Sequence, residues 1–193
     1  MPTLLDDLNE QQREAVVHGE GPLLVSAGAG SGKTRVLTYR IAHLLASGSA
    51  DSAEITAVTF TNKAAKEMRE RVESLLGRPL HGGFVGTFHR WALEVLRRWP
   101  RAAGLANRFG IADADDQRAI MQRALKDLGL DPKELPPRMV LSRISSMVNR
   151  GTDREAFVDR ASSASDETVG RLWERYEKLK TAAAVVDFDD MLV

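Results

Sequence analysis

The sequence contains Ala27-Gly28-Ala29-Gly30-Ser31-Gly32-Lys33-Thr34, a glycine-rich segment that ends in lysine and threonine. Glycines allow the backbone to curl so that successive amide groups point at one anion, and a following helix presents its N-terminus to that anion. Lys33 supplies a positive charge to the β- and γ-phosphates, and the Thr34 hydroxyl is a suitable ligand for Mg²⁺. The segment therefore predicts a nucleotide-binding P-loop, with Ala27 in place of the usual first glycine.

The flanks of this loop support the same prediction. Leu23-Leu24-Val25 is a short apolar run, which is typical of a buried strand. Residues 33–46 carry apolar side chains at the spacing of one helix face. A flexible glycine turn is the alternative, but such a turn needs neither lysine and threonine at its end nor an apolar strand before it.

The rest of the chain changes character near residue 105. Before it, strands and helices alternate; after it, the periodicity predicts helices only, so we expect a parallel-sheet domain followed by a helical one. The predicted strands are Ile55–Phe60 and Phe84–Thr87. The predicted helices span residues 9–18, with Asn9 as N-cap, and residues 62–76, 115–128, 138–150 and 166–184. A further helix carries Phe88, Trp91, Val95 and Trp99 at helical spacing and stops at Pro100.

Composition limits the class of protein. The 193 residues are 43% hydrophobic, enough for a core, and 27 basic residues balance 27 acidic ones, so the chain has no overall basic field for nucleic acid. Residues 61–101 hold nine lysines and arginines against four glutamates, which allows a local basic surface or simply solvated helix faces.

Targeting signals are not apparent in the sequence. There is no cysteine, so disulfides and zinc–thiolate sites are excluded. The segment 1–14 lacks the apolar run of a signal peptide, and no stretch reaches the ~18 apolar residues of a membrane span. We expect a soluble cytoplasmic protein with no membrane partner.

Four segments in order resemble one known family. They are Asn9-Glu-Gln-Gln12, Ala27 to Arg35 around the P-loop, Thr59-Phe-Thr-Asn-Lys-Ala-Ala65 and Val85-Gly-Thr-Phe-His89. Any one of them is weak apart from the P-loop, but the ordered set closely resembles the UvrD/PcrA/Rep group of superfamily 1 DNA helicases.

The resemblance implies a role for each segment. Gln12 would recognise the adenine edge and Arg35 would lie beside the adenine, while the P-loop residues 27–34 would hold the phosphates of ATP with its Mg²⁺. Two further segments would grip single-stranded DNA by stacking and polar contacts. These DNA-binding residues are Thr59, Phe60, Thr61, Asn62, Lys63, Gly86, Thr87, Phe88 and His89.

Each of these residues also has a purely structural alternative. Gln12 could be an exposed helix residue, Phe60 could belong to the core, Asn62 could cap the next helix, and His89 could be structural. Trp91 and Trp99 lie on an apolar helix face, so we predict that they belong to the core.

The family also implies a fold class and an activity. The fold would be α/β, a RecA-like P-loop NTPase parallel sheet with helices, in residues 1–104, followed by an inserted all-helical subdomain in 105–184 and a return segment in 185–193. The return segment includes the aspartate-rich Asp187 to Leu192. The complete enzyme would be an ATP-dependent DNA helicase moving 3′ to 5′ along single-stranded DNA, with DNA and repair or replication proteins as partners.

The sequence departs from the family pattern at its end. The expected second ATPase motif, a strand ending in Asp-Glu, has no clear counterpart, because Phe188 follows Asp187 in the candidate Ala184-Val-Val-Asp187. We therefore expect a chain truncated before that motif and before the second motor domain, with weak ATP binding and no unwinding. Two alternatives remain: a non-catalytic fragment that binds nucleotide or single-stranded DNA, and a small P-loop kinase.

Overall fold

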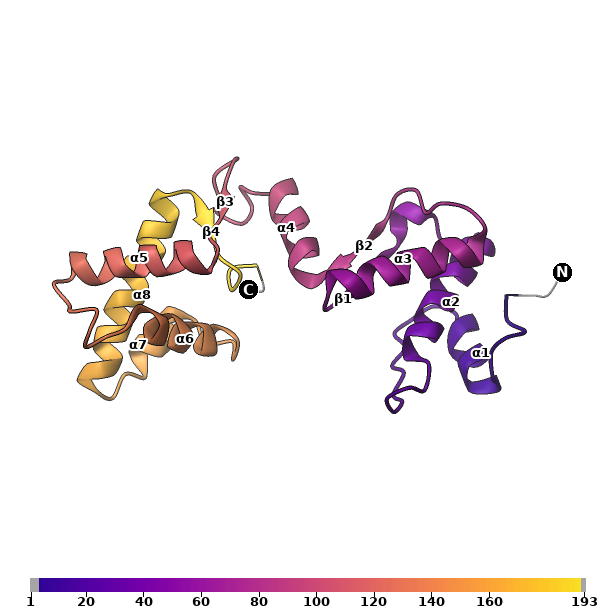
Figure 1. Cartoon of the computed structure of the whole chain (residues 1–193), viewed down its shortest axis with the longest axis horizontal. Coiled ribbons are helices and arrows are strands. Elements are labelled where there is room, and N and C mark those ends of the chain that lie inside the picture. Colours follow the sequence, from indigo (N-terminus) through magenta and orange to yellow (C-terminus); the bar gives the residue numbers. More distant parts are fainter. Residues whose placement is uncertain (1–3, 192–193) are drawn as a thin grey trace. The chain divides into compact units, whose positions relative to one another are not determined.

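The computed structural model describes residues 4–191. The chain divides into two compact units, Met1–Trp91 and Ala92–Val193, and the division falls inside helix α4 (Phe88–Arg98). Figure 1 shows the elements of each unit in order along the chain. In the part of the chain that the structure describes, no helix is long and apolar enough to cross a membrane.

The first unit contains a small parallel sheet with helices packed on it. Its elements are α1 (Glu10–Val17), α2 (Lys33–Ala46), the 3-10 turn η1 (Ser52–Glu54), β1 (Thr56–Thr59), α3 (Asn62–Leu76) and β2 (Phe84–Thr87). Strands β1 and β2 pair in parallel with Thr56 opposite Phe84 and Thr59 opposite Thr87. The connection between the two parallel strands runs through α3, which packs against both of them.

Local sequence explains where these helices begin and end. Asn9 caps α1 with a reciprocal capping box, in which its side chain accepts from the Gln12 amide at 2.9 Å. Thr61 caps α3, accepting from the Ala64 amide at 3.1 Å. Gly77 ends α3 with φ of +65°, a left-handed conformation that favours glycine.

Two apolar clusters hold the first unit together. The larger joins α2, β1, α3 and β2 through Ile41, Leu45, Ile55, Ala57, Met68, Val72, Leu80 and Val85. The smaller joins α1 to α2 through Leu8, Val16 and Val36. Arg40 of α2 reinforces this junction, because its guanidinium donates to the carbonyl oxygens of His18 at 2.7 Å and Ala15 at 3.2 Å, which the end of α1 leaves unsatisfied.

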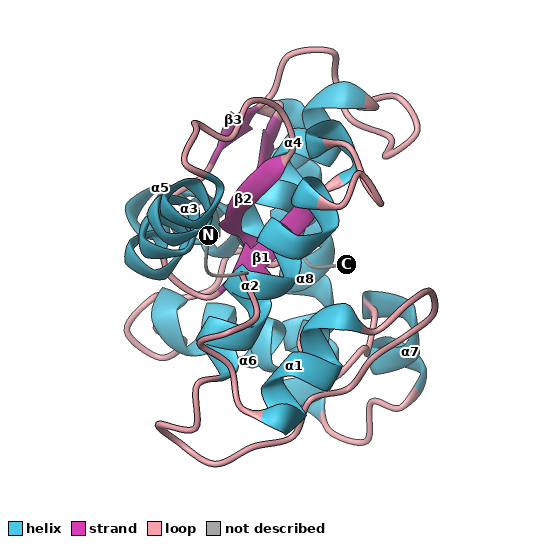
Figure 2. Cartoon of the chain, turned by 90° about the vertical axis from the view of Figure 1, so that its right-hand side faces the viewer, coloured by secondary structure: helices cyan, strands magenta, loops and turns pink. Residues whose placement is uncertain are grey.

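The second unit is mainly helical. Figure 2 draws the helices of the whole chain in cyan and its strands in magenta. Its elements after α4 are β3 (Gly110–Ile111), α5 (Ala114–Asp127), α6 (Pro137–Val148), α7 (Arg154–Asp159), α8 (Ala164–Ala182) and β4 (Val185–Val186). Asp113, Asp153 and Ser163 cap three of these helices with side-chain oxygens, and Pro137 starts α6 at the position that tolerates proline. The predicted helices 115–128, 138–150 and 166–184 are thus confirmed to within a few residues.

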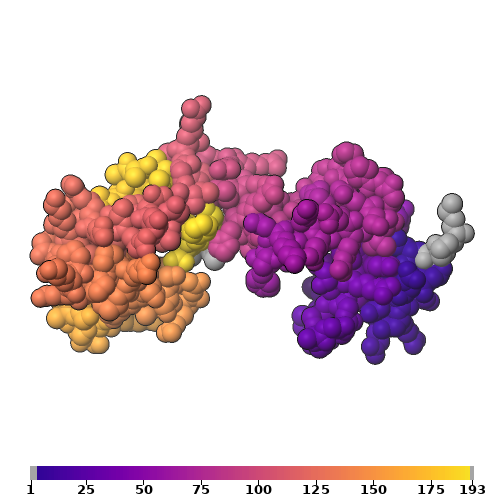
Figure 3. Space-filling model, in the orientation of Figure 1, coloured from indigo at the N-terminus to yellow at the C-terminus, as the bar shows by residue number. Residues whose placement is uncertain are grey.

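The core of the second unit lies where α5, α6 and α7 meet α8. Its fully buried side chains include Met121, Leu125, Leu172 and Tyr176, and the rings of Phe157 and Trp173 pack 5.9 Å apart. Parallel pairing of β4 with β3 brings the C-terminal segment back to residues near 110, and in Figure 3 the yellow atoms of that segment lie against earlier parts of the same unit.

Three predictions from sequence are wrong in this structure. Leu23–Val25 is not a strand, and Leu24 is 91% exposed. The backbone groups of a strand need a neighbouring strand as hydrogen-bond partner, and the described strands of the first unit pair only with each other. Trp91 and Trp99 are not core residues, since α4 buries no side chain and they are 43% and 54% exposed. The helical region also includes the short strand β3.

Two further predictions concern domain organisation. The fold is mixed α/β with small parallel sheets, which agrees with the coarse class expected from the sequence. The finer assignment, a RecA-like core to residue 104 with an inserted subdomain to residue 184, stays a prediction. Leu192 and Val193, where the predicted return segment ends, lie outside the described residues.

Candidate nucleotide and nucleic-acid site

The glycine-rich loop, residues 27–34, contains two glycines in the left-handed conformation and leads directly into α2. Gly30 and Gly32 have φ of +75° and +89°, and the loop is tightened by a Ser31 hydroxyl that donates to the Gly28 carbonyl at 2.7 Å. Gly32 is the N-cap of α2 and contributes no side-chain acceptor, so the first amides of the helix have no capping side chain. The start of α2 therefore leaves backbone amides without a side-chain acceptor, and the prediction that they bind phosphate stays a prediction.

Lys33 lies folded over this loop. Its ammonium group donates to the carbonyl oxygens of Ala27 at 2.6 Å and Gly28 at 2.7 Å. The charge is therefore placed at the loop, where it can turn toward a phosphate if those two hydrogen bonds are exchanged. Thr34 follows in the first turn of α2 with an exposed side chain, and Ala29 lies exposed at the tip.

Gln12 and Arg35 lie near the glycine-rich loop, and each side chain is held by hydrogen bonds to a different part of the chain. The Gln12 amide nitrogen donates to the Ser31 carbonyl at 3.2 Å, and its oxygen accepts from the Asn9 amide at 3.2 Å. The Arg35 guanidinium donates to the Asp7 carbonyl at 2.8 Å and lies 5.3 Å from the centroid of the Tyr39 ring. Gln12 is thus placed against the loop and is not merely a solvated helix residue.

The two predicted DNA-binding segments meet at one edge of the sheet. Because β1 and β2 are parallel and in register, Thr59 lies opposite Thr87, and both chains leave the sheet at its carboxyl end. The next residues, Phe60 and Phe88, pack with ring centroids 5.6 Å apart. Phe60 remains 89% exposed, which excludes the alternative that it belongs to the core.

The polar residues of these segments have mixed environments. Thr61, not Asn62, caps α3, so Asn62 is the first helical residue and is exposed like Lys63. The Thr87 hydroxyl accepts from the Arg90 amide at 3.3 Å at the start of α4, and His89 is exposed in the first turn of that helix. Gly86 has no room for a side chain, because an added Cβ would overlap the ring of Phe84.

A buried charge network, which the sequence did not reveal, anchors the C-terminal segment of the second unit. The Lys180 ammonium of α8 donates to Asp187 at 2.8 Å and to both carboxylate oxygens of Asp190 at 2.7 Å, and the Tyr176 hydroxyl donates to Asp187 at 3.0 Å. The sequence shows Asp187 and Asp190 as part of an aspartate-rich run, but it gives no sign of their partners, because Tyr176 and Lys180 of α8 look like ordinary helix residues.

Burial and charge shift the ionisation of this network. Burial alone would raise the pKa of Asp187, but the Lys180 ammonium and the hydrogen bonds hold it below its ordinary value. Burial raises the pKa of Asp190, and the neighbouring Asp187 charge adds to the rise. Burial opposes the charge on Lys180, but the two carboxylates outweigh it and raise the Lys180 pKa. Burial and the Asp187 carboxylate also raise the pKa of Tyr176.

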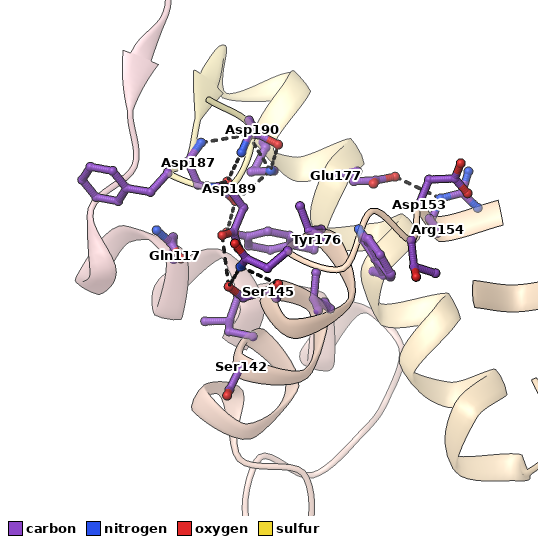
Figure 4. A pocket seen from close by; sticks show the side chains of 18 of the residues that line it. Gln117, Ser142, Ser145, Asp153, Arg154, Tyr176, Glu177, Asp187, Asp189 and Asp190 are labelled. Carbon is purple, nitrogen blue, oxygen red and sulfur yellow. Dashed lines mark hydrogen bonds and ion pairs between the residues drawn. The ribbon is translucent and has the colours of Figure 1, made fainter. Parts of the chain in front are cut away.

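The network borders a cavity of about 830 Å³ between α6 and α8. Figure 4 shows Ser145 and Asp189 facing each other there, and the Ser145 hydroxyl donates to the Asp189 carboxylate at 3.0 Å. Among the described residues no group of three or more carboxylate, imidazole or thiol side chains is arranged to hold a metal ion. Asp187 is tied to Lys180 and Tyr176, so it serves here as an anchor of the chain.

Comparison with known proteins identifies the family. The chain is 44% identical to the ATP-dependent DNA helicase PcrA of Leuconostoc citreum over 192 residues, covering 99% of this chain and 26% of that protein. It is 45% identical to the ATP-dependent DNA helicase UvrD1 of Mycobacterium bovis over 193 residues, covering 98% of this chain and 25% of that protein. The chain thus spans about a quarter of the length of these relatives.

A family model gives the same result over nearly all of the sequence. Residues 8–193 match the UvrD/REP helicase N-terminal domain. This range includes the P-loop, both segments at the sheet edge and the helical unit described above. The chain therefore belongs to the UvrD/REP helicase family, through the N-terminal domain of that family.

Proposed function

We infer that the protein is an ATP-dependent DNA helicase that moves 3′ to 5′ along single-stranded DNA, and that residues 1–193 carry its ATP-binding part. The observation that carries the proposal is the pairing of Phe60 with Phe88 at the carboxyl edge of β1 and β2, in the same unit as the P-loop. An exposed aromatic pair beside polar side chains suits the stacking of unpaired bases.

The nucleotide would be held by the loop and the start of α2. Lys33 and Thr34 are proposed to act on the phosphates and on Mg²⁺, with backbone amides of residues 28–34 as the remaining donors. Gln12 and Arg35 are proposed to bind the adenine, and each must first exchange a hydrogen bond that it makes within the protein, to Ser31 and to Asp7 respectively. ATP supplies the free energy that drives movement along DNA.

For the isolated 193 residues we propose weak nucleotide binding without efficient turnover. The Lys33 ammonium makes two short hydrogen bonds to loop carbonyls, and these must be broken before it can bind phosphate. The exposed and unpaired segment Leu23–Val25 leaves the loop without the rigid strand that would fix its position. This is the observation that favours a binding module as the second candidate function.

The test is to measure ATP binding and ATPase rate on this chain, with and without single-stranded DNA. We expect measurable binding of Mg·ATP that is abolished by Lys33→Ala and unchanged by Lys126→Ala, an exposed lysine on α5. We expect Phe60→Ala to weaken the binding of single-stranded DNA by about 5- to 100-fold, the usual cost of a lost stacking contact. DNA-stimulated turnover by the isolated chain would refute the weak-turnover proposal, and failure to bind either ligand would refute the assignment itself.

A further inference from the structure

The second unit carries an acid-free basic segment, residues 95–112, that spans the end of α4 and the loop to β3. It contains Arg97, Arg98, Arg101 and Arg108 and no aspartate or glutamate. All four arginines are exposed, and Trp99 among them is 54% exposed. Its first three arginines belong to the basic excess of residues 61–101 and lie outside both the glycine-rich loop and the two sheet-edge segments.

The segment has a defined shape around its tryptophan. The Trp99 amide donates to the Val95 carbonyl at 3.0 Å, which continues α4 by one residue, and the Leu105 amide donates to the Pro100 carbonyl at 2.8 Å to close the next turn. The Arg98 guanidinium lies 5.0 Å from the centroid of the Trp99 ring. An aromatic face is thus held beside the Arg98 guanidinium.

The charge of the basic segment is not neutralised from within the described chain. None of its four arginines forms an ion pair there, and Arg101 donates only to the Asn107 side chain at 3.2 Å. Two acids, Glu177 and Asp190, line a cavity beside the loop, but these acids pair with Arg154 and Lys180. Arginines of the last helical turn stabilise the helix C-terminus, yet this accounts only for those in α4 itself.

We propose that the basic segment is a second DNA contact, in which Arg97, Arg98 and Arg101 bind the phosphates of a single strand and Trp99 stacks on one of its bases. Arginine matches phosphate geometry with paired donors, and an aromatic ring beside it accepts any base. The zero net charge of the chain means that attraction to DNA must come from such local clusters. The proposal rests on the helicase function and adds a contact outside the sheet edge.

The experiment measures the binding of a labelled single-stranded oligothymidylate to the whole chain by fluorescence anisotropy at several salt concentrations. The test variant is Arg97→Gln/Arg98→Gln/Arg101→Gln. Each phosphate contact contributes about 0.7 to the slope of log affinity against log salt, so we expect the slope to fall by about 2 and the affinity at ~0.1 M salt to fall about 100-fold. Trp99→Leu should weaken binding at least about fivefold, and Trp99→Phe should restore most of it.

A matched control removes the same charge elsewhere in the second unit. The variant Arg138→Gln/Arg160→Gln/Arg171→Gln changes three exposed arginines, in α6, at the end of α7 and in α8, and should leave the slope within experimental error. Thermal unfolding of both triple variants reports whether either change has damaged the fold. A loss of affinity with an unchanged melting temperature supports the proposal.

Three results would overturn it, and they separate it from the proposed function. If Phe60→Ala weakens binding but the test variant does not, the sheet edge binds DNA and the basic segment does not. If an acidic peptide of equal charge binds as tightly and Trp99→Leu changes neither ligand, the segment is a surface for acidic proteins. If the unaltered chain binds no DNA, both the proposal and the helicase function fall.

Discussion

Replacing Lys180 with methionine should destabilise the second unit mainly through charge. The substitution keeps an apolar stem of similar length but removes the ammonium that donates to Asp187 and Asp190. Breaking a buried ion pair by removing one partner costs about 3–5 kcal/mol of unfolding free energy. The Asp187 side chain is 6% exposed and that of Asp190 is 38% exposed, so water compensates part of the second charge and we expect about 3 kcal/mol.

The assay is urea unfolding followed by tryptophan fluorescence, whose change reports mainly on Trp173, because Trp173 is 4% exposed whereas Trp91 and Trp99 are already exposed in the folded chain. The matched control is Lys178→Met on the same helix, where the ammonium pairs with Glu174 at 2.6 Å and the lysine side chain is 63% exposed. An exposed pair of this kind contributes about 0–1 kcal/mol. The difference between the two variants isolates the buried network from any general effect of removing a lysine.

The pH dependence of the deficit distinguishes charge from packing. Without Lys180, the buried Asp187 carboxylate and the partly exposed Asp190 carboxylate beside it should have pKa values raised above the ordinary ~4, because desolvation and mutual repulsion both favour protonation. A carboxylate whose pKa is higher in the folded state than in the unfolded state destabilises the fold at high pH. This destabilisation disappears as pH falls below the pKa of the unfolded state. The deficit of Lys180→Met should therefore shrink between about pH 7 and about pH 4.5. An equal deficit at both pH values would refute the electrostatic account and assign the loss to packing.

Three further predictions concern the rest of the chain. Gly32→Ala should destabilise the first unit by about 1–2 kcal/mol in thermal unfolding, because φ is +89° and an added Cβ would lie 2.9 Å from the Gln12 amide nitrogen. Arg40→Met should cost about 1–3 kcal/mol in urea unfolding, since it leaves carbonyls at the end of α1 without donors, whereas the exposed Arg71→Met should cost under about 0.5 kcal/mol. Because the pKa of Lys180 is raised in the folded protein, its ammonium stabilises the second unit fully at pH values below its ordinary pKa of 10.5, and this stabilisation is lost as pH rises through the folded pKa. The unaltered protein should therefore lose stability at alkaline pH, and Lys180→Met should not show this loss.

Most of the helices were predictable from sequence because their causes are local. A helix depends on periodic apolar residues, caps and breakers within its own span, so α3 was placed at residues 62–76 and β2 at 84–87 without knowledge of the fold. The curled backbone at the loop glycines was also predictable, since Gly30 and Gly32 adopt the left-handed conformation that glycine permits.

The predictions that failed concern residues whose structure depends on tertiary contacts with segments distant in sequence. Leu23–Val25 is apolar enough for a strand, but a strand exists only where another strand takes its hydrogen bonds. Trp91 and Trp99 have core-like spacing on α4, yet whether an apolar helix face is covered is decided by which element packs on it.

The sequence by itself predicted a P-loop at residues 27–34 and two DNA-binding segments, Thr59–Lys63 and Gly86–His89, and its similarity to known proteins shows the family. Tertiary structure alone decided that Phe60 pairs with Phe88, because parallel pairing brings together residues from two separate strands. It also decided that Lys180 neutralises Asp187 and Asp190, a partnership that depends on the chain returning beside α8. Local conformation follows from residues near in sequence, whereas the environment of a side chain follows from contacts between distant segments, and those exist only in the folded chain.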